Sequence, residues 1–333
     1  MIKKGAKLSE KIFKRDIERV ATRDGYGEGL VMAGEKDENV VVLCADVTKP
    51  TRSHLFQDKF PERFIEVGVA EQALATIASG MANYGKIPFI SSFAMFSPGR
   101  NWEQIRTTIA LNGVPVKIGG SHAGINVGPD GATHQALEDI AIMRAIPNMI
   151  VIAPGDAVET KKAVVEAAGN GKPTYIRFAR EKSPVFTTDK TPFKIGRADI
   201  LWQAKDSQVA IIACGPLVYK ALLAAKKLES TGIGVMIINS HTIKPIDEQV
   251  IIRAAKITGA IVTVEEHQIT GGLGGAVAEV LAKNFSVPIE FIGMPDKFGE
   301  SGQSNELLEK YGMKAVNIVK AVKKAIKRKK DGE

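Results

Sequence analysis

Residues 64–93 decide the fold; they read FIEVGVAEQALATIASGMANYGKIPFISSF. The stretch begins and ends with short runs of apolar and β-branched residues, which are typical of strands. Between these runs, alanine, leucine and isoleucine dominate from about Glu71 to Tyr84 and Gly85, and glycine is a common helix stop. The pattern predicts a strand, a helix and a second strand, which is the repeating unit of an α/β sheet.

The same alternation continues on both sides of this stretch. Continuous apolar strands between helices indicate parallel sheets that are covered on both faces. We therefore expect an α/β fold with two domains, each a mostly parallel sheet with helices on both faces. The expected strands are residues 40–45, 63–67, 88–92, 115–119, 149–153 and 174–178, followed by 208–214, 234–239, 260–265 and 288–292.

The boundary between the domains is expected where this alternation stops. Residues 180–203 carry prolines, threonines and charges and show no strand–helix rhythm. A chain of 333 residues is also too long for one ordinary core. We predict a first domain over residues 1–185, a linker over 186–204 and a second domain over 205–333.

Composition and charge exclude several classes of protein. Hydrophobic residues make up 44% and charged residues 25% of the chain, as in ordinary globular proteins. No stretch approaches the roughly 18 apolar residues of a membrane-spanning helix, and the basic N-terminus lacks the apolar region of a secretory signal. The net charge of +8 gathers partly in the last segment, KAVKKAIKRKK. Because no nucleic-acid motif accompanies it, we expect a solvated helix end and neither a nucleic-acid nor a membrane partner.

The two cysteines indicate the redox environment. Cys44 and Cys214 each stand in an apolar, strand-like run, VVLCAD and AIIACG. Such positions favour buried free thiols over a disulfide or a metal pair. Buried free thiols fit a reducing cytoplasm, which is the expected location of the protein.

Glu71 opens a helix that is apolar or small on nearly every face, and such a helix is expected to be buried. Its carboxylate has two possible roles. It either interacts favourably with the dipole at the helix N-terminus, which is a common structural role, or it lies buried away from water at the edge where parallel strands end and ligands bind. A buried carboxylate without a cation partner has a raised pKa and can share a proton with a ligand nitrogen. Phe93 and Phe96, near the end of the next strand, either pack in the core or enclose a flat heteroaromatic ring.

A glycine-rich segment, SHAGINVGPDGATHQ, spans residues 121–135. It carries His122, Asp130 and His134, a set of side chains that could hold a metal ion. Their spacing fits neither a zinc-binding helix nor a zinc finger, so no metal site is predicted here. The glycines suit a tight path of the backbone toward a ligand.

The chain resembles the second half of transketolase from about residue 21 to about residue 302. The segments that carry the resemblance follow one another in the family's order. They are ATRDGYGEGL, LCADVTKPT, EVGVAEQALATIASGMANYG, SSFAMFSPGRN, SHAGINVGPDGATHQALEDIAIMRAIPNM, YIRFAREKSP, EEHQITGGLGG and GMPDKFGESG.

This resemblance implies thiamine diphosphate as the cofactor. Glu71 matches the glutamate that bonds the pyrimidine N1′ and promotes loss of the thiazolium C2 proton. Phe93 and Phe96 match aromatic residues beside the pyrimidine, whereas Gly99 stands near the place of a third aromatic residue. Asp46, after the first strand, matches a residue near the cofactor at the subunit interface; a strand-end cap is its structural alternative.

The resemblance assigns the remaining polar residues to a sugar phosphate, so residues 121–135 are named the sugar loop. His134 would move protons at the donor hydroxyls, Asp130 would bond the C2 hydroxyl, and His122 would lie nearer the phosphate. Arg180 and Arg23 match arginines that hold the phosphate, for which a bidentate guanidinium is well suited.

The glycine-rich turn of the second half is a weak signal for phosphate. His267 precedes the glycines of residues 271–275, and GGLGG is not a dinucleotide fingerprint. Close packing and subunit contact are the expected roles of this turn.

One expected motif is missing. The family holds the diphosphate through a divalent cation, bound by a motif that begins GDG and ends in Asn about 30 residues later, and this sequence does not contain it. The resemblance therefore implies an N-terminal-type transketolase subunit as partner, in an α2β2 heterotetramer, with Mg²⁺ or Ca²⁺ held mainly by that partner. The alternatives are the β subunit of a 2-oxo-acid dehydrogenase and a non-catalytic assembly subunit.

Overall fold

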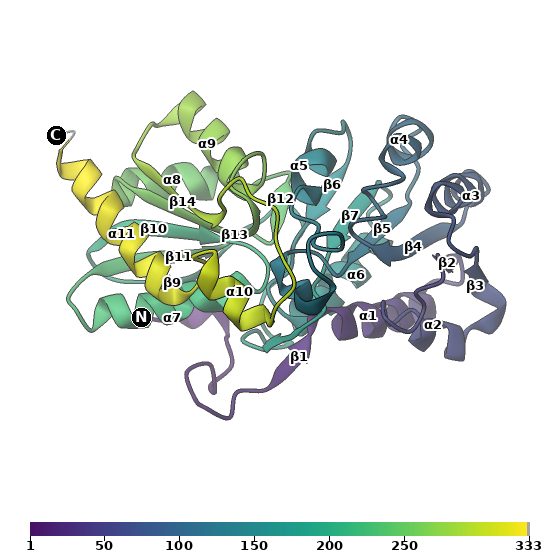
Figure 1. Ribbon diagram of the computed structural model, residues 1–333, viewed down its shortest axis with the longest axis horizontal. Helices are drawn as coiled ribbons and strands as arrows, with labels where there is room; N and C mark the ends of the chain where they lie inside the picture. The colour runs from purple at the N-terminus through teal and green to yellow at the C-terminus, as the bar shows by residue number, and fades with distance from the viewer. Residues whose placement is uncertain (332–333) are drawn as a thin grey trace.

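A computed structural model describes residues 1–331. Two α/β units lie side by side, each on its own central sheet (Figure 1). All ten strands predicted from the sequence are present, and the predicted fold class is confirmed. Cys44 and Cys214 are buried free thiols, as predicted. Among the described helices, none combines the length and the apolar character that crossing a bilayer requires.

The first unit holds a seven-stranded sheet in the order β12, β6, β7, β5, β4, β2, β3, in which β12 alone of the described strands is antiparallel to its neighbour. The register aligns the strand ends, since Phe93 pairs with Ser121 and Cys44 pairs with Glu66. The loops that follow these strands therefore leave from one edge of the sheet. The strands are β2 (Val40–Cys44), β3 (Phe64–Glu66), β4 (Ile87–Phe93), β5 (Lys117–Ser121), β6 (Ile150–Ile152), β7 (Thr174–Arg177) and β12 (Thr242–Lys244).

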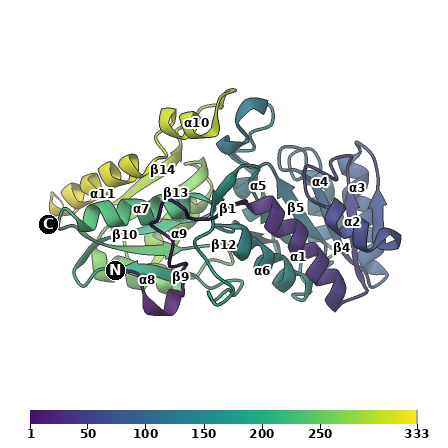
Figure 2. The same ribbon diagram turned by 90° about the horizontal axis from the view of Figure 1, so that it is seen from below.

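Helices cover both faces of this sheet. α1, α2 and α6 share one core, which includes Tyr26 and Phe56, and Figure 2 shows α1 beside α6. α3, η3 and α5 pack on the other face around Leu74 and Ile109. The helices are α1 (Thr22–Lys36), α2 (His54–Lys59), α3 (Glu71–Asn83), α4 (Trp102–Gln104), π-helical η3 (Ile105–Ala110), α5 (Asp139–Arg144) and α6 (Ala157–Ala168), with 3₁₀ turns η2 (Pro61–Arg63) and η4 (Ile125–Asp130).

α3 is the predicted helix, but it is not buried on every side. It begins at Glu71 and ends before Gly85, whose φ of 87° suits glycine. Leu74 faces the core, whereas Ile77 is 41% exposed and Val69, just before the helix, is 71% exposed. The expectation of an all-round buried helix is therefore wrong, because one apolar side of α3 faces outward in the described chain.

The second unit holds a five-stranded sheet in the order β14, β13, β10, β11, β9, with β9 antiparallel to β11. α8 and α9 cover one face, and α7, α10 and α11 lie on the side of the other core. The basic tail forms α11 and packs through Ile318 and Val322, so it is a docked amphipathic helix as well as a solvated end. The elements are β9 (Asp199–Gln203), β10 (Ser207–Ala213), α7 (Leu217–Glu229), β11 (Gly234–Asn239), α8 (Glu248–Thr258), β13 (Ile261–Gln268), α9 (Leu273–Asn284), β14 (Ile289–Met294), α10 (Ser304–Lys310) and α11 (Ala315–Lys330).

Three segments depart from the predicted domain boundaries. Residues 1–17, which include η1 (Lys4–Ala6), pack on the second unit, where Ile12 is buried in its core. Residues 199–203 were expected in the linker, but they form edge strand β9 of the second sheet. β12, from the second half of the chain, completes the first sheet. The units exchange edge segments, which join them more firmly than a single linker would. A further ribbon pairs β1 (Arg19–Ala21) with β8 (Lys182–Pro184).

Candidate active site

The predicted site residues gather where the parallel strands of the first sheet end. Open α/β sheets bind ligands at this edge, near the point where the strand order reverses. The reversal occurs at β2, which lies between β3 and β4. Five neighbouring strands each supply a predicted residue: Glu71 follows β3, Asp46 follows β2, Phe93 ends β4, His122 follows β5 and Arg180 follows β7.

Glu71 is buried at the start of α3, with 3% of its surface exposed. Arg100 donates from Nη1 to Glu71 Oε2 at 2.7 Å. Asn101 Nδ2 donates to the Glu71 carbonyl at 2.8 Å and so fixes the start of the helix. The expectation that this carboxylate has no cation partner is therefore wrong.

Arg100 is a site residue that the sequence analysis missed. Its guanidinium lies 4.8 Å from the centre of the Phe96 ring, and about half of its side chain is exposed. The amide of Arg100 donates to the Phe96 carbonyl at 2.9 Å, so the two residues stand one helical turn apart. The spacing of four residues between Phe96 and Arg100 is the sequence feature that could have placed Arg100 at this site.

Four rings form an aromatic cluster beside Glu71: Phe93, Phe96, His122 and His134. Phe93 stacks on His122 with ring centres 4.0 Å apart and an interplanar angle of 27°. His134 meets Phe96 edge-on at 5.4 Å. Both phenyl rings remain partly exposed, so the reading of these residues as core packing is not favoured.

The environment of His122 keeps its ring neutral. Burial lowers the pKa of His122 to about 3, and the positive charges of Arg23, Arg180 and His134 lower it further in the same direction. The residue has a left-handed φ of 56°, which is uncommon outside glycine and is often found at functional sites. Ser121 Oγ and His122 Nδ1 share a hydrogen bond of 2.8 Å. A neutral imidazole can both donate and accept a hydrogen bond at neutral pH.

The two predicted phosphate-binding arginines are held differently. Arg180 Nη1 donates to Asp130 Oδ1 at 3.1 Å and to the Val127 carbonyl at 2.9 Å, so Arg180 and Asp130 form an ion pair with each other. Arg23 donates to the Pro50 carbonyl at 3.1 Å, and its Nε is buried without a partner among residues 1–331. Burial, followed by repulsion from Arg52, lowers the pKa of Arg23.

Asp46 lies exposed after β2 with a φ of 56°. Its amide donates to Glu66 Oε1 at 2.7 Å, and Glu66 also accepts from Thr48 Oγ1 and the Gly68 amide. Glu66, which the sequence analysis did not single out, thus ties the loop after β2 to the segment that leads into Glu71. The assignment of Asp46 to the cofactor stays a prediction.

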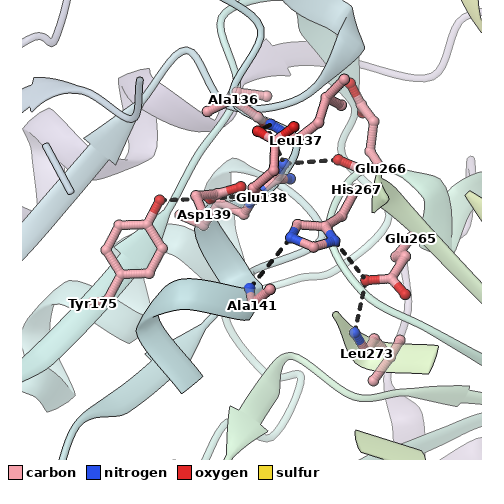
Figure 3. A network of polar contacts seen from close by, with 12 residues as sticks. Ala136, Leu137, Glu138, Asp139, Ala141, Tyr175, Glu265, Glu266, His267 and Leu273 are labelled. Atoms are coloured by element: carbon pink, nitrogen blue, oxygen red, sulfur yellow. Dashed lines mark hydrogen bonds and ion pairs between the residues drawn. The ribbon is translucent and has the colours of Figure 1, made fainter. Parts of the chain in front are cut away.

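Glu266 of the second unit holds the sugar loop in place through hydrogen bonds. Glu266 accepts hydrogen bonds from the Asn126 amide at 2.6 Å and from Asn126 Nδ2 at 2.9 Å. Arg177 donates to the Glu266 carbonyl at 2.7 Å and to Asp139 at 2.8 Å. Asp139 also accepts from the Tyr175 hydroxyl, as Figure 3 shows. This buried network fixes the position of the loop that carries Asp130 and the two histidines.

The glycine-rich turn of the second unit is closely packed. A Cβ atom on Gly272 would lie 2.0 Å from Glu265 Oε2. His267 Nε2 accepts from the Ala141 amide at 3.3 Å, which joins β13 to α5 (Figure 3). These contacts agree with the predicted packing role, and subunit contact by this turn stays a prediction.

Comparisons with known proteins identify the family. Residues 18–185 match the family described as "Transketolase, pyrimidine binding domain", and residues 196–318 match "Transketolase, C-terminal domain". The chain belongs to the transketolase family. Because members of this family depend on thiamine diphosphate, the site described above is a candidate thiamine site.

Relatives of similar length show which part of transketolase this chain covers. A protein of Methanocaldococcus jannaschii, provisionally named as a transketolase C-terminal section, is 47% identical over 92% of this chain and 96% of its own length. The 6-deoxy-6-sulfo-D-fructose transketolase subunit SqwH of Clostridium sp. (strain MSTE9) is 39% identical over 95% of this chain and 98% of that protein. A solved structure described as an inactive β4 tetramer of a split-gene transketolase superposes with a TM-score of 0.87 at 44% identity, over 93% and 99% of the two chains. Over most of its length, the chain thus resembles the C-terminal sections of split transketolases.

Proposed function

We propose that this chain, joined to an N-terminal-type subunit, transfers a two-carbon ketol unit from a ketose phosphate to an aldose phosphate. The observation that carries the proposal is the buried Glu71 carboxylate beside Phe93 and Phe96, in a chain without the diphosphate-binding motif. The reaction belongs to pentose phosphate metabolism.

The cofactor proposal rests on how well these side chains fit the pyrimidine half of thiamine diphosphate. The acid can bond a ring nitrogen, and the partly exposed phenyl rings can pack against a flat heterocycle. When bound, thiamine diphosphate supplies an electron sink for cleaving and forming the carbon–carbon bond beside a carbonyl. Glu71 would hold and share the proton at N1′, and Asp46 would lie near the cofactor at the interface.

We expect Arg100 to release Glu71 when that nitrogen binds at the same carboxylate oxygen. The ion pair occupies Oε2, and the guanidinium covers the Phe96 ring where a heterocycle would stack. Since Arg100 is about half exposed, it can turn toward solvent at a cost of about 1 kcal/mol.

The substrate would lie along the sugar loop. His134 would move protons at the donor hydroxyls, and neutral His122 would donate or accept a hydrogen bond without carrying charge. Arg23 and Arg180 would hold the phosphate, and Asp130 would bond the C2 hydroxyl once Arg180 turns to the phosphate. Guanidinium groups favour phosphate because they pair with it through two parallel hydrogen bonds.

The partner proposal is supported by an exposed apolar stripe on α3. Positions four and three residues apart lie on one side of a helix. Ile77 is 41% exposed and Tyr84 is 91% exposed, and a contiguous apolar surface of this kind is typical of an interface. We call it the outer stripe: Val69, Ala73, Ile77, Gly80 and Tyr84.

The stripe would pack against the N-terminal-type subunit, in an α2β2 heterotetramer that also contains self-association of this chain. That subunit would hold the diphosphate through Mg²⁺ or Ca²⁺. The inactive β4 tetramer described for a relative fits a C-terminal section that cannot work alone. The two buried free thiols fit a cytoplasmic location.

The test is reconstitution. The chain would be co-expressed with a candidate partner that bears the GDG…Asn motif, purified as a complex, and assayed with thiamine diphosphate, Mg²⁺, xylulose 5-phosphate and ribose 5-phosphate. We expect transfer by the complex and none by either chain alone. Activity on pyruvate or branched 2-oxo acids instead would favour the 2-oxo-acid dehydrogenase β subunit, and a complex inactive on both substrate classes would favour an assembly subunit.

A further inference from the structure

A second group of polar side chains lies at the junction of the two units, after the carboxyl end of β6. Glu159 is on α6 of the first unit, Asp199 begins β9 of the second, and His241 stands between β11 and β12. One oxygen or nitrogen atom from each residue lies within 4.8 Å of those of the other two. Glu159 and His241 are buried, and about a quarter of the Asp199 side chain is exposed.

The His241 ring is fixed so that one nitrogen has nothing to bond. Its Nδ1 shares a hydrogen bond of 3.0 Å with Thr242 Oγ1, and Phe193 stacks on the ring at 4.3 Å. Its Nε2 is buried and has no hydrogen-bond partner among residues 1–331; Asp199 Oδ2 lies 3.7 Å away. A buried polar atom without a partner is unusual and points to a group that completes it.

The carboxylates of the cluster also lack a strong cation. Glu159 accepts hydrogen bonds from the Gly155 amide at 2.6 Å and from Asn239 Nδ2 at 2.7 Å, and no lysine or arginine of the described chain forms an ion pair with it. Burial raises the pKa of Glu159 to about 7. The charge of Glu159 acts to raise the pKa of Lys162, but Lys162 Nζ donates to the carbonyls of Thr188 and Thr191 and not to Glu159. The amide oxygen of Asn239, Oδ1, is likewise buried without a partner in the described residues.

We propose that Glu159, Asp199 and His241 bind a divalent transition-metal ion of the zinc type. Such an ion takes nitrogen and carboxylate ligands at about 2.0–2.2 Å, which places ligand atoms about 3.4 Å apart in a tetrahedron. The 3.7 Å between His241 Nε2 and Asp199 Oδ2 is close to this separation, and the exposed Asp199 can move to close the rest. An imidazole ligand favours zinc over Mg²⁺ or Ca²⁺, which prefer oxygen ligands.

The position of the ligands suggests a structural role for the ion. It would connect α6 of the first unit to β9, an edge strand of the second sheet, and to the segment just before β12, which joins the first sheet. A single ion would thus tie together the segments through which the two units exchange edges. Asp199 is the ligand exposed to solvent, so the ion would enter past it, and a water molecule would be the fourth ligand.

The full chain without cofactor or partner is used for the test, so that the cation of the active site does not interfere. The chain is loaded with Zn²⁺, dialysed against metal-free buffer and analysed for bound metal, and Co²⁺ replaces Zn²⁺ to report the ligand geometry by its visible absorption. The variants are His241→Ala and Asp199→Asn. The matched control is His54→Ala, on α2, which removes a histidine outside the cluster.

We expect one zinc ion per chain in the wild type and in the control, a more than tenfold loss of affinity in His241→Ala, and about a tenfold loss in Asp199→Asn. Circular dichroism shows whether each variant is folded, and the nearly isosteric Asp199→Asn covers the case in which His241→Ala does not fold. A wild-type chain that retains no zinc, or a folded variant that binds zinc as the wild type does, would overturn the proposal.

Discussion

Replacing Glu71 tests its catalytic role separately from its structural role, because we expect a large loss of kcat and a small loss of folding stability. The ion pair with Arg100 is half exposed on the arginine side, so Glu71→Gln should cost at most about 1 kcal/mol of stability. That corresponds to a melting temperature lower by less than about 4 °C. Loss of a positioned proton-sharing group lowers kcat by about 10² to 10⁴, which equals about 3–5 kcal/mol of activation free energy.

The assay compares two-carbon transfer by complexes that contain wild-type chain, Glu71→Gln, Glu71→Ala or the control Glu62→Gln. The Glu62 side chain is 71% exposed on η2, and within residues 1–331 it forms a single ion pair, with its neighbour Arg63. We expect both Glu71 variants to assemble and melt almost normally while losing at least hundredfold in kcat. A kcat of Glu71→Gln within about tenfold of wild type would refute the proton-sharing role. A variant that fails to assemble would instead make Glu71 a structural residue.

Four further outcomes are expected from the same geometry. Arg100→Gln frees Glu71 and should tighten cofactor binding to the complex about fivefold in a fluorescence titration, and weaker binding would make Arg100 a cofactor ligand. Burial lowers the pKa of His122 to about 3, so the unfolded state binds more protons than the folded state between about pH 3 and 6.5. The free energy of unfolding therefore falls as the pH drops through that window. Measured by urea unfolding, the wild type should lose about 2 kcal/mol more than His122→Gln between pH 8 and pH 5. Glu266→Gln removes an acceptor from the sugar loop and should raise KM for the sugar phosphate about tenfold with little change in kcat, whereas an unchanged KM would deny Glu266 a positioning role. Ile77→Glu puts a charge on the outer stripe and should weaken association with the partner at least about tenfold in sedimentation experiments, while leaving the melting temperature of the isolated chain unchanged.

The strands that sequence reasoning found and those it missed differ in direction. All ten predicted strands have a parallel neighbour, and most of them are largely buried and read as apolar runs; the edge strand β3 is only partly buried. The missed strands β1, β8, β9 and β12 pair only antiparallel, and all of them except β9 are three residues long, with sequences such as KSP and TIK. Their partners lie far away in the chain, as Arg19 and Pro184 do. A local pattern carries no information about such a pairing.

In the site, too, some features could be predicted from local sequence patterns and others depend on contacts between distant residues. The edge of the sheet could be predicted because the order of strands and helices sends Glu71, Phe93 and His122 to one side. The pair of Glu71 and Arg100 could not, since it joins residues 29 positions apart through the turn that follows β4. The apolar pattern of α3 was correctly recognised, but periodicity does not tell whether an apolar face meets the same chain or another one.

The arginines around the aromatic cluster suggest how substrate and site rearrange together. Arg100 is paired with Glu71 and Arg180 with Asp130, whereas Arg23 has no carboxylate partner among residues 1–331. Arg23 therefore has charge to offer a phosphate at once, and Arg180 must leave Asp130 to do the same. That exchange would free the Asp130 carboxylate for a sugar hydroxyl only when a phosphate is present. Two contacts of one substrate would then form together, which favours phosphorylated sugars over free ones beyond the attraction of the positive charges alone.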